Sequence, residues 1–151
     1  MDCIFCEFVR KRKVYHKKGY PFFINHETKN TISFLSIDSP VNDDAHLIII
    51  PKAHYKDFHQ IPPKILGELI DHVALAGRFY ASKKRGYNLL LNNSRVAGQF
   101  VPHSHFHVIP RKRADMIKIE VWERKKISAD DFKKLSIATA AEFKRHATNR
   151  K

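Results

Sequence analysis

Two periods of hydrophobic and polar residues run through the chain, and each predicts one kind of element. Alternating or continuous runs of apolar and β-branched residues predict strands at residues 22–24, 31–38, 46–51, 87–91 and 102–109. The 46–51 run holds almost no polar residue, so we expect this strand at the centre of a sheet. Turn-forming residues at 25–30 predict a turn, and residues 117–122 alternate as a half-exposed strand does.

Helical spacing predicts a long helix that begins at Pro62–Pro63 and runs to about Lys84, followed by Gly86 at the position where glycine commonly ends a helix. A C-terminal helix should begin at Ser128, whose hydroxyl can cap it. Strands dominate the centre of the chain. We therefore expect one α+β domain over residues 1–151, with a mainly antiparallel sheet of about five strands, one long central helix and a C-terminal helix.

The charge balance adds a question about partners. The chain has 28 Lys and Arg against 15 Asp and Glu, a formal net charge of +13 spread along its length. This favours either affinity for nucleic acid or a surface that is simply solubilising, and both stay open. Because no apolar run reaches the ~20 residues that cross a bilayer, and the N-terminus does not follow a signal pattern, we expect a cytoplasmic protein with no membrane partner.

The only cysteines, Cys3 and Cys6, form a C-x-x-C pair. A redox pair usually opens a helix after a strand, and no strand is expected before Cys3. The alternatives are half of a zinc site and free structural thiols. We favour zinc, because the histidine-rich chain can supply the two further ligands that a tetrahedral site needs.

Three histidines, His103, His105 and His107, alternate within one predicted strand. Alternate residues of a strand share a face, so the three imidazoles should lie on one side of the sheet. Such a row suits metal ligation or chemistry near neutral pH. A neutral imidazole can also attack phosphorus and form a labile phosphoramidate. The residues alone leave metal binding and catalysis open.

The stretch from Asn92 to Arg111 resembles the signature of the histidine triad (HIT) superfamily, N-x-x-x-x-x-G-Q-x-x-x-H-x-H-x-H. Two more blocks match in the expected order: Asp2–Cys6, and His46–His54, which ends in Pro-Lys-x-His. The resemblance is to the zinc-bearing branch of nucleotide hydrolases and transferases. It covers roughly residues 2–111 and leaves a C-terminal extension, about 116–151, outside the match.

The resemblance implies a HIT hydrolase or nucleotidyl transferase that cleaves phosphoric anhydride or phosphoramidate bonds at the α-phosphate, through a nucleotidyl-histidine intermediate. The substrate would be an adenosine conjugate or a dinucleoside polyphosphate. His105 matches the nucleophile, and His107 matches the residue that hydrogen-bonds the phosphate oxygens. Asn92 and Gln99 match groups that contact the phosphate and hold the loop. Either Ser36 or Asp38 would meet the ribose, with Asp38 favoured for its charge.

The resemblance also assigns the metal. In zinc-bearing members the two cysteines join the first triad histidine and the histidine of Pro-Lys-x-His. Here these are Cys3, Cys6, His54 and His103, a closed structural zinc site that would fix the backbone just before His105. A homodimer whose sheets join across the interface is implied as well.

Three positions need comment. Ser104 replaces a residue that is usually hydrophobic, and Phe100 replaces a Ser or Thr whose hydroxyl can assist the leaving group. His46 matches a histidine close to the triad, where a packing and a catalytic role are equally open. Two other functions remain as alternatives. One is an aprataxin-like hydrolase of adenylylated nucleic-acid ends, although the cysteine count forbids its usual second zinc finger; the other is a non-catalytic zinc-bound nucleotide or nucleic-acid binding module.

Overall fold

The computed structural model describes residues 3–11, 23–37, 45–119, 121 and 126–148. Asp38, the favoured ribose contact, lies outside the described residues. The chain divides into two compact units, Met1–Ile117 and Lys118–Lys151, which we describe separately. The expectation of a single domain over the whole chain stays a prediction.

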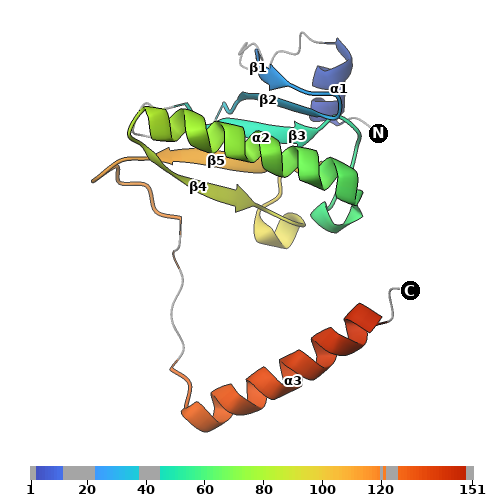
Figure 1. Cartoon of the computed structure of the whole chain (residues 1–151), viewed down its shortest axis with the longest axis vertical. Helices are drawn as coiled ribbons and strands as arrows, with labels where there is room; N and C mark the ends of the chain where they lie inside the picture. The colour runs from blue at the N-terminus through green and yellow to red at the C-terminus, as the bar shows by residue number, and fades with distance from the viewer. Residues whose placement is uncertain (1–2, 12–22, 38–44, 120, 122–125, 149–151) are drawn as a thin grey trace. The chain divides into compact units, whose positions relative to one another are not determined.

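The first unit is built on a five-stranded antiparallel sheet in the order β1-β2-β3-β5-β4 (Figure 1). The strands are β1 (Ile24–Glu27), β2 (Thr31–Leu35), β3 (Leu47–Pro51), β4 (Gly86–Leu91) and β5 (Phe106–Arg111). Every residue of β3 is buried and the strand is central, as its apolar run predicts. The predicted α+β class is confirmed.

The strands predicted at residues 22–24 and 117–122 differ from the structure, and the strand predicted at 31–38 ends at Leu35. β1 continues through Glu27, although residues 25–27 have turn chemistry, because an irregularity after Ile24 restores pairing of His26 with Ser33. As an exposed edge strand it carries polar side chains and shows no hydrophobic face. Residues 117–119 and 121 form no strand; Ala114 and Met116 just before them adopt positive φ angles, which turn the chain.

Helix α2 (Pro63–Ser82) crosses one face of the sheet (Figure 1). Its buried Leu69, Val73 and Tyr80 pack on Leu47 and Val108 of the strands. The end of α2 differs from the prediction: Lys84, at φ 54°, takes the left-handed position, and Gly86 already begins β4. The backbone N–H groups of Lys84 and Arg85 bind the carbonyls of Ala81 and Tyr80, so the turn closes without glycine.

The helix α1 (Ile4–Lys11) contributes to a second hydrophobic cluster of this unit. The rings of Phe5 and Phe8 meet Phe34 edge-on, with centroids 5.4 and 4.8 Å apart, and Ile32, Ile48 and Ile50 complete the cluster. This packing holds Cys3 and Cys6 beside the ends of β3 and β5. The cysteine pair therefore lies next to the histidine segment that is about a hundred residues away in sequence.

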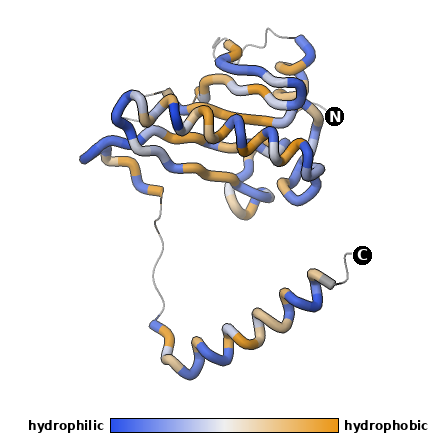
Figure 2. The backbone as a smooth tube through the Cα atoms, viewed as in Figure 1, coloured by the Kyte–Doolittle hydropathy of each residue, from blue (hydrophilic) through white to orange (hydrophobic). Residues whose placement is uncertain are grey.

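The second unit contains α3 (Ala129–Thr148). The Ser128 hydroxyl accepts a hydrogen bond from the Asp131 N–H at 3.1 Å, so the predicted cap and C-terminal helix are confirmed. Apolar and polar turns alternate along α3 in Figure 2, and Phe132, Leu135 and Phe143 are exposed. Among the described residues, none of the helices is long and apolar enough to cross a membrane.

Candidate functional site

The histidine segment is only partly a strand. β5 begins at Phe106, so His107 lies in the ladder, opposite Ile48 of β3 and Leu90 of β4. His103 lies in a bend ahead of the strand, and the prediction of a continuous strand from residue 102 is wrong there. The bend releases His103 from the two-residue alternation, so its side chain can turn to another partner.

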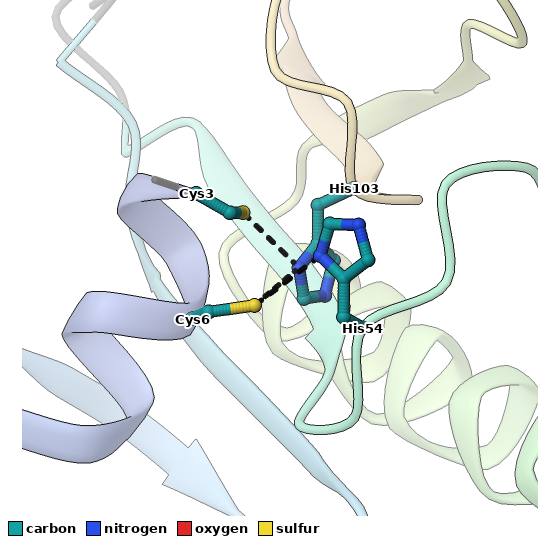
Figure 3. A group of neighbouring side chains, drawn as sticks. All are labelled: Cys3, Cys6, His54 and His103. Carbon is teal, nitrogen blue, oxygen red and sulfur yellow. Dashed lines mark hydrogen bonds between the residues drawn. The ribbon is translucent and has the colours of Figure 1, made fainter. Parts of the chain in front are cut away.

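That partner is the cysteine pair (Figure 3). Cys3, directly before α1, and Cys6, on α1, extend toward the imidazoles of His103 and His54, and the four ligand atoms lie within 4.8 Å of one another. Cys6 Sγ is 3.2 Å from His54 Nδ1 and 3.5 Å from His103 Nδ1, and Cys3 Sγ is also 3.5 Å from His103 Nδ1. All four predicted metal ligands are therefore together.

The donor chemistry of this cluster fits a metal ion. His103 Nε2 donates a hydrogen bond to the Pro51 carbonyl at 2.9 Å, which leaves the Nδ1 lone pair facing the sulfurs. Burial lowers the pKa of His103 to about 4 and so keeps the ring neutral, the form that ligates. Two sulfurs and two imidazole nitrogens at this spacing match a tetrahedral Cys₂His₂ set. The four residues can thus hold one metal ion, closed to further ligands.

Beside the cluster, a cavity of about 500 Å³ opens on the α1 side of the sheet. Four predicted site residues line it, two that directly follow β2 and β4 and two from the histidine segment: Ser36, Asn92, His105 and His107. Its walls are otherwise mostly apolar, with Phe5, Phe34, Ile37 and Ile48 among them. An apolar pocket with a few polar groups at one side is the usual form of a small-molecule site.

His105 is held in one orientation. Its Nδ1–H donates to the His103 carbonyl at 2.7 Å, so the Nε2 atom carries the lone pair. The ring of Phe5 meets the imidazole edge-on at 5.3 Å. Burial lowers the pKa of His105, although the bond to the carbonyl opposes the shift. A buried, neutral imidazole with a free Nε2 is a competent nucleophile.

His107 forms a pair with His46. His46 Nε2 and His107 Nδ1 share a hydrogen bond of 3.0 Å, and the rings of His105 and His107 lie 4.8 Å apart. Burial first, and then the neighbouring His105, lower the pKa of His107 to about 4. The hydrogen bond fixes which nitrogen of His107 is left for a ligand. The sequence left the role of His46 open between packing and catalysis. In the structure, His46 contacts His107 and can position its ring.

Gln99 and Asn92 differ in position. Gln99 Oε1 accepts from the Ser94 N–H at 3.0 Å and Gln99 Nε2 donates to the Lys56 carbonyl at 2.7 Å, so the amide ties the loop together. Gln99 is not among the described residues that line the cavity, whereas Asn92 is. The Asn92 amide lies close to Gly98, whose φ of +86° suits glycine, and donates to its carbonyl at 3.4 Å.

Sequence reasoning missed two groups that shape the site. The ring of Phe5, inside the C-x-x-C pair, meets the rings of His103 and His105 edge-on, with ring centroids 5.8 and 5.3 Å apart. The Pro51 carbonyl sets the tautomer of His103. The position of Phe5 between the two cysteines could have predicted that its ring packs beside the metal ligands. A backbone carbonyl carries no signal in the sequence.

The comparisons with known proteins agree with this architecture. The HIT domain family matches residues 13–114. Adenosine 5'-monophosphoramidase HNT1 of Candida albicans is 38% identical over 117 residues, which cover 74% of this chain and 71% of the relative. The protein of the same name from Saccharomyces cerevisiae is 35% identical over 134 residues, 88% of this chain and 77% of the relative.

A solved structure gives the same result for the fold. The crystal structure of histidine triad nucleotide-binding protein from Candida albicans superposes with a TM-score of 0.77 and 31% identity, covering 95% of this chain and 99% of that one. The histidine motif, the sheet order and the family match therefore all support the same family assignment. This chain belongs to the HIT domain family.

Proposed function

We propose that this protein is a hydrolase that releases AMP from an adenosine phosphoramidate through a covalent intermediate on His105. The observation that carries the proposal is the His105 imidazole at the cavity wall, with Nδ1 bound to the His103 carbonyl and Nε2 free to attack. The relatives from two yeasts are named as adenosine 5'-monophosphoramidases, which supports the choice of substrate over an adenylylated nucleic-acid end. We expect the reaction in the cytoplasm.

The reaction has two displacements. His105 Nε2 attacks the α-phosphorus, the Nε2–P bond forms, the P–N bond breaks, and the leaving amine takes a proton from water at the cavity mouth. Water then attacks phosphorus, the Nε2–P bond breaks, and AMP leaves with His105 neutral again. With His46 Nε2–H donating to its Nδ1, neutral His107 carries its own proton on Nε2 and donates that N–H to the phosphate oxygens as their charge develops. Asn92 adds an amide at the same wall.

The nucleoside would occupy the apolar part of the cavity. Phe34, Ile37 and Ile48 offer a hydrophobic slot for a base, and Ser36, between Phe34 and Ile37 in sequence, lines the same cavity. We propose Ser36 as a ribose contact, and we keep Asp38, two residues on, as a second one.

We propose zinc as the structural metal of Cys3, Cys6, His54 and His103. Two thiolates and two imidazoles are the ligands that zinc prefers in closed sites. When bound, the ion supplies a cross-link and no Lewis acid to the substrate, because His105 rather than the cluster lines the cavity. The cross-link would hold α1, and with it Phe5, against the His105 backbone.

A homodimer is the expected assembly. β4 is an edge of the sheet, and Leu89 on it is exposed, so two copies can join their sheets there. Sedimentation velocity of the wild type and of Leu89→Lys measures this directly. A dimer that becomes a monomer in the variant supports the interface, and a wild-type monomer at all concentrations rejects it.

The function is tested by AMP release from adenosine 5'-phosphoramidate, with the wild type, His105→Ala and the control His59→Ala. His59 is an exposed histidine outside the cavity, so its loss should leave the rate unchanged. We expect His105→Ala to lose at least about 10³-fold in kcat/KM, because the covalent route is closed. AMP release that persists in His105→Ala rejects the mechanism. Nucleotide binding without turnover in the wild type would identify a non-catalytic binding module.

A further inference from the structure

A second cavity, of about 350 Å³, lies on the opposite face of the sheet from His105 and His107. Neighbouring residues of one strand point to opposite faces, and Ser33 of β2 lines this second cavity, whereas Phe34 lines the first. Helix α2 crosses this face of the sheet and contributes part of the cavity wall (Figure 1). The second cavity is therefore separate from the site described above.

The walls of the second cavity divide into an apolar and a polar side. The apolar side is formed by residues at the start of β3 and on α2: Ala45, Leu47, Leu75, Ala76 and Phe79. The polar side is formed by residues on β1, β2 and α2: Asn25, His26, Ser33 and His72. No lysine, arginine or carboxylate is among the described residues that line it, so this space favours a ligand without charge. We call it the α2 cavity.

A chain of hydrogen bonds sets the donors and acceptors at the floor of the α2 cavity. It begins at the Glu68 carboxylate, which accepts from the Thr28 hydroxyl. Because that hydroxyl has a single proton, the 2.7 Å contact between the Thr28 and Thr31 hydroxyls must use the proton of Thr31. The 2.8 Å contact between Thr31 Oγ1 and His72 Nδ1 must then use the proton on the histidine nitrogen.

The chain ends at Ser33, which faces the α2 cavity. Burial first, and then the neighbouring His26, lower the pKa of His72 to about 4, so the imidazole is neutral at neutral pH. With its proton on Nδ1, His72 Nε2 is an acceptor, and the Ser33 hydroxyl donates to it at 3.0 Å. The 3.4 Å contact of Ser33 Oγ with the His26 carbonyl cannot use the same proton. Toward a ligand, Ser33 Oγ can therefore only accept a hydrogen bond.

The rim of the α2 cavity supplies the opposite partner. Asn25 and His26 are exposed on the edge strand β1, and within the described part of the chain neither side chain makes a hydrogen bond. The His26 ring meets the His72 ring edge-on, with centroids 4.8 Å apart, so it lies beside the floor. Both rim side chains carry N–H groups that can donate to a ligand. An acceptor at the floor and donors at the rim match a ligand that carries an N–H group beside a carbonyl oxygen.

We propose that the α2 cavity binds an uncharged aromatic carboxamide. The amide NH₂ of the ligand donates to Ser33 Oγ, and its carbonyl oxygen accepts from Asn25 or His26. The ring of the ligand lies on the apolar side, where Phe79 offers an aromatic contact. A carboxylate of the same shape fits poorly, because it has no N–H for Ser33 and meets no cation among the described lining residues.

The test is a titration of the isotopically labelled wild type with benzamide, followed by the chemical shifts of the backbone amides. We expect a dissociation constant of about 1 mM, which is typical of a one-ring ligand. The largest shifts should occur at Ser33, His72 and Ala76, and those of Asn92 and His107 should not change. Acetophenone, which keeps the ring and the carbonyl but has no N–H, should bind at least about tenfold more weakly, and so should benzoate.

Two variants and one matched control place the ligand. His26→Ala removes an exposed imidazole from the rim, and His59→Ala removes an exposed imidazole outside the cavity. We expect benzamide to bind His26→Ala about threefold to tenfold more weakly and to bind His59→Ala as it binds the wild type. Ser33→Ala should weaken binding at least about tenfold. Because Ser33→Ala also takes a donor from His72, circular dichroism checks its fold, and Asn25→Ala replaces it if it does not fold.

Three results would overturn the proposal. One is the absence of benzamide binding to the wild type at concentrations up to roughly 10 mM. Another is equal affinity for benzamide and acetophenone, because the N–H group would then have no partner. The third is a shift pattern centred on Asn92 and His107, which would place benzamide in the first cavity.

Discussion

At the scale of single residues, Phe100 is the departure with the clearest chemical consequence. It lines the mouth of the cavity, is 86% exposed, and stands where the resemblance expects a hydroxyl that assists the leaving group. Val96, on the same loop, is 100% exposed and does not line the cavity among the described residues. The pair provides a test position and a control.

We expect Phe100→Ser to raise kcat/KM for an adenosine phosphoramidate with a poor amine leaving group by about tenfold, since a hydroxyl can donate to the departing nitrogen. Val96→Ser should leave it unchanged. Steady-state AMP release with a series of amines of different pKa gives the comparison. A rise in kcat/KM of the same size in both variants would show that residue 100 does not act on the leaving group.

Ser104 departs from the expected pattern in the opposite way, by adding a polar group to the core. It is 1% exposed, and its Oγ is the one buried side-chain polar atom without a hydrogen-bond partner among the described residues. Burying an unsatisfied hydroxyl costs about 1–3 kcal/mol.

Ser104→Ala should therefore raise the free energy of unfolding by about 0.5–1 kcal/mol, the cost of the small void offsetting part of the gain. Ser82→Ala serves as the control, because Ser82 is exposed and its hydroxyl is bonded to the Phe79 carbonyl. Urea denaturation measures both. A destabilised Ser104→Ala would mean that the hydroxyl has a partner, such as an ordered water.

At the scale of elements, the cluster of Cys3, Cys6, His54 and His103 joins α1 to the segments that follow β3 and precede β5, and a bound metal ion would fasten them together. α1 is short, with eight residues, and such a helix is marginal without tertiary support. Phe5 and the His103 carbonyl, the two groups that orient His105, are both next to the cluster ligands.

Removing the metal should lower the melting temperature and then the AMP-release rate, because α1 and the His105 backbone lose their common anchor. We expect about one zinc per chain by mass spectrometry, lost in Cys6→Ser and kept in His59→Ala. Differential scanning calorimetry after chelation and after zinc is restored gives the second readout. A protein with less than half an equivalent of zinc and an unchanged melting temperature after chelation would contradict the structural role.

Glu68 joins α2 to the β1–β2 turn. Its carboxylate accepts hydrogen bonds from the Thr28 hydroxyl and from the backbone and side-chain N–H groups of Asn30, at 2.8 and 2.7 Å. These bonds lower the pKa of Glu68 to about 2. The folded pKa lies below the unfolded one, so this contribution to stability is present above the unfolded pKa and is lost as pH falls toward the folded pKa.

The wild type should lose more stability between about pH 5 and pH 3 than Glu68→Gln does, since the amide does not titrate. Urea midpoints at the two pH values for both proteins give the difference. Equal losses in the wild type and in Glu68→Gln would show that the carboxylate is not held by these contacts.

At the scale of the whole molecule, local patterns predicted most of the fold. The apolar 46–51 run gave the central strand, and the prolines at 62–63 gave the start of α2. The polar end of β1, residues 25–27, was predicted as a turn, because an exposed edge strand has no buried face to show in the sequence. The end of α2 was misplaced because a lysine at positive φ closes the turn, a choice that depends on tertiary contacts.

For the site, the motif spacing predicted which residues come together better than it predicted how their side chains are oriented. The four cluster residues meet as the resemblance implies, although the two-residue alternation would have put His103 on the face of His105. The bend before Phe106 reconciles the two. Asn92, Ser36, His105 and His107 share one cavity, whereas Gln99 braces the loop. Such a division of roles arises from backbone hydrogen bonds, which sequence does not display.

The central claim is that His105 becomes covalently bonded to the nucleotide. Rapid mixing of enzyme with excess adenosine 5'-phosphoramidate, a denaturing quench at a pH that preserves phosphoramidates, and tandem mass spectrometry of the peptides test it most directly. We predict an adenylyl group on His105 in the wild type and none on any residue in His105→Ala. An adenylyl group on another residue, or AMP release at the wild-type rate with no adenylated peptide at any time point, would contradict the account.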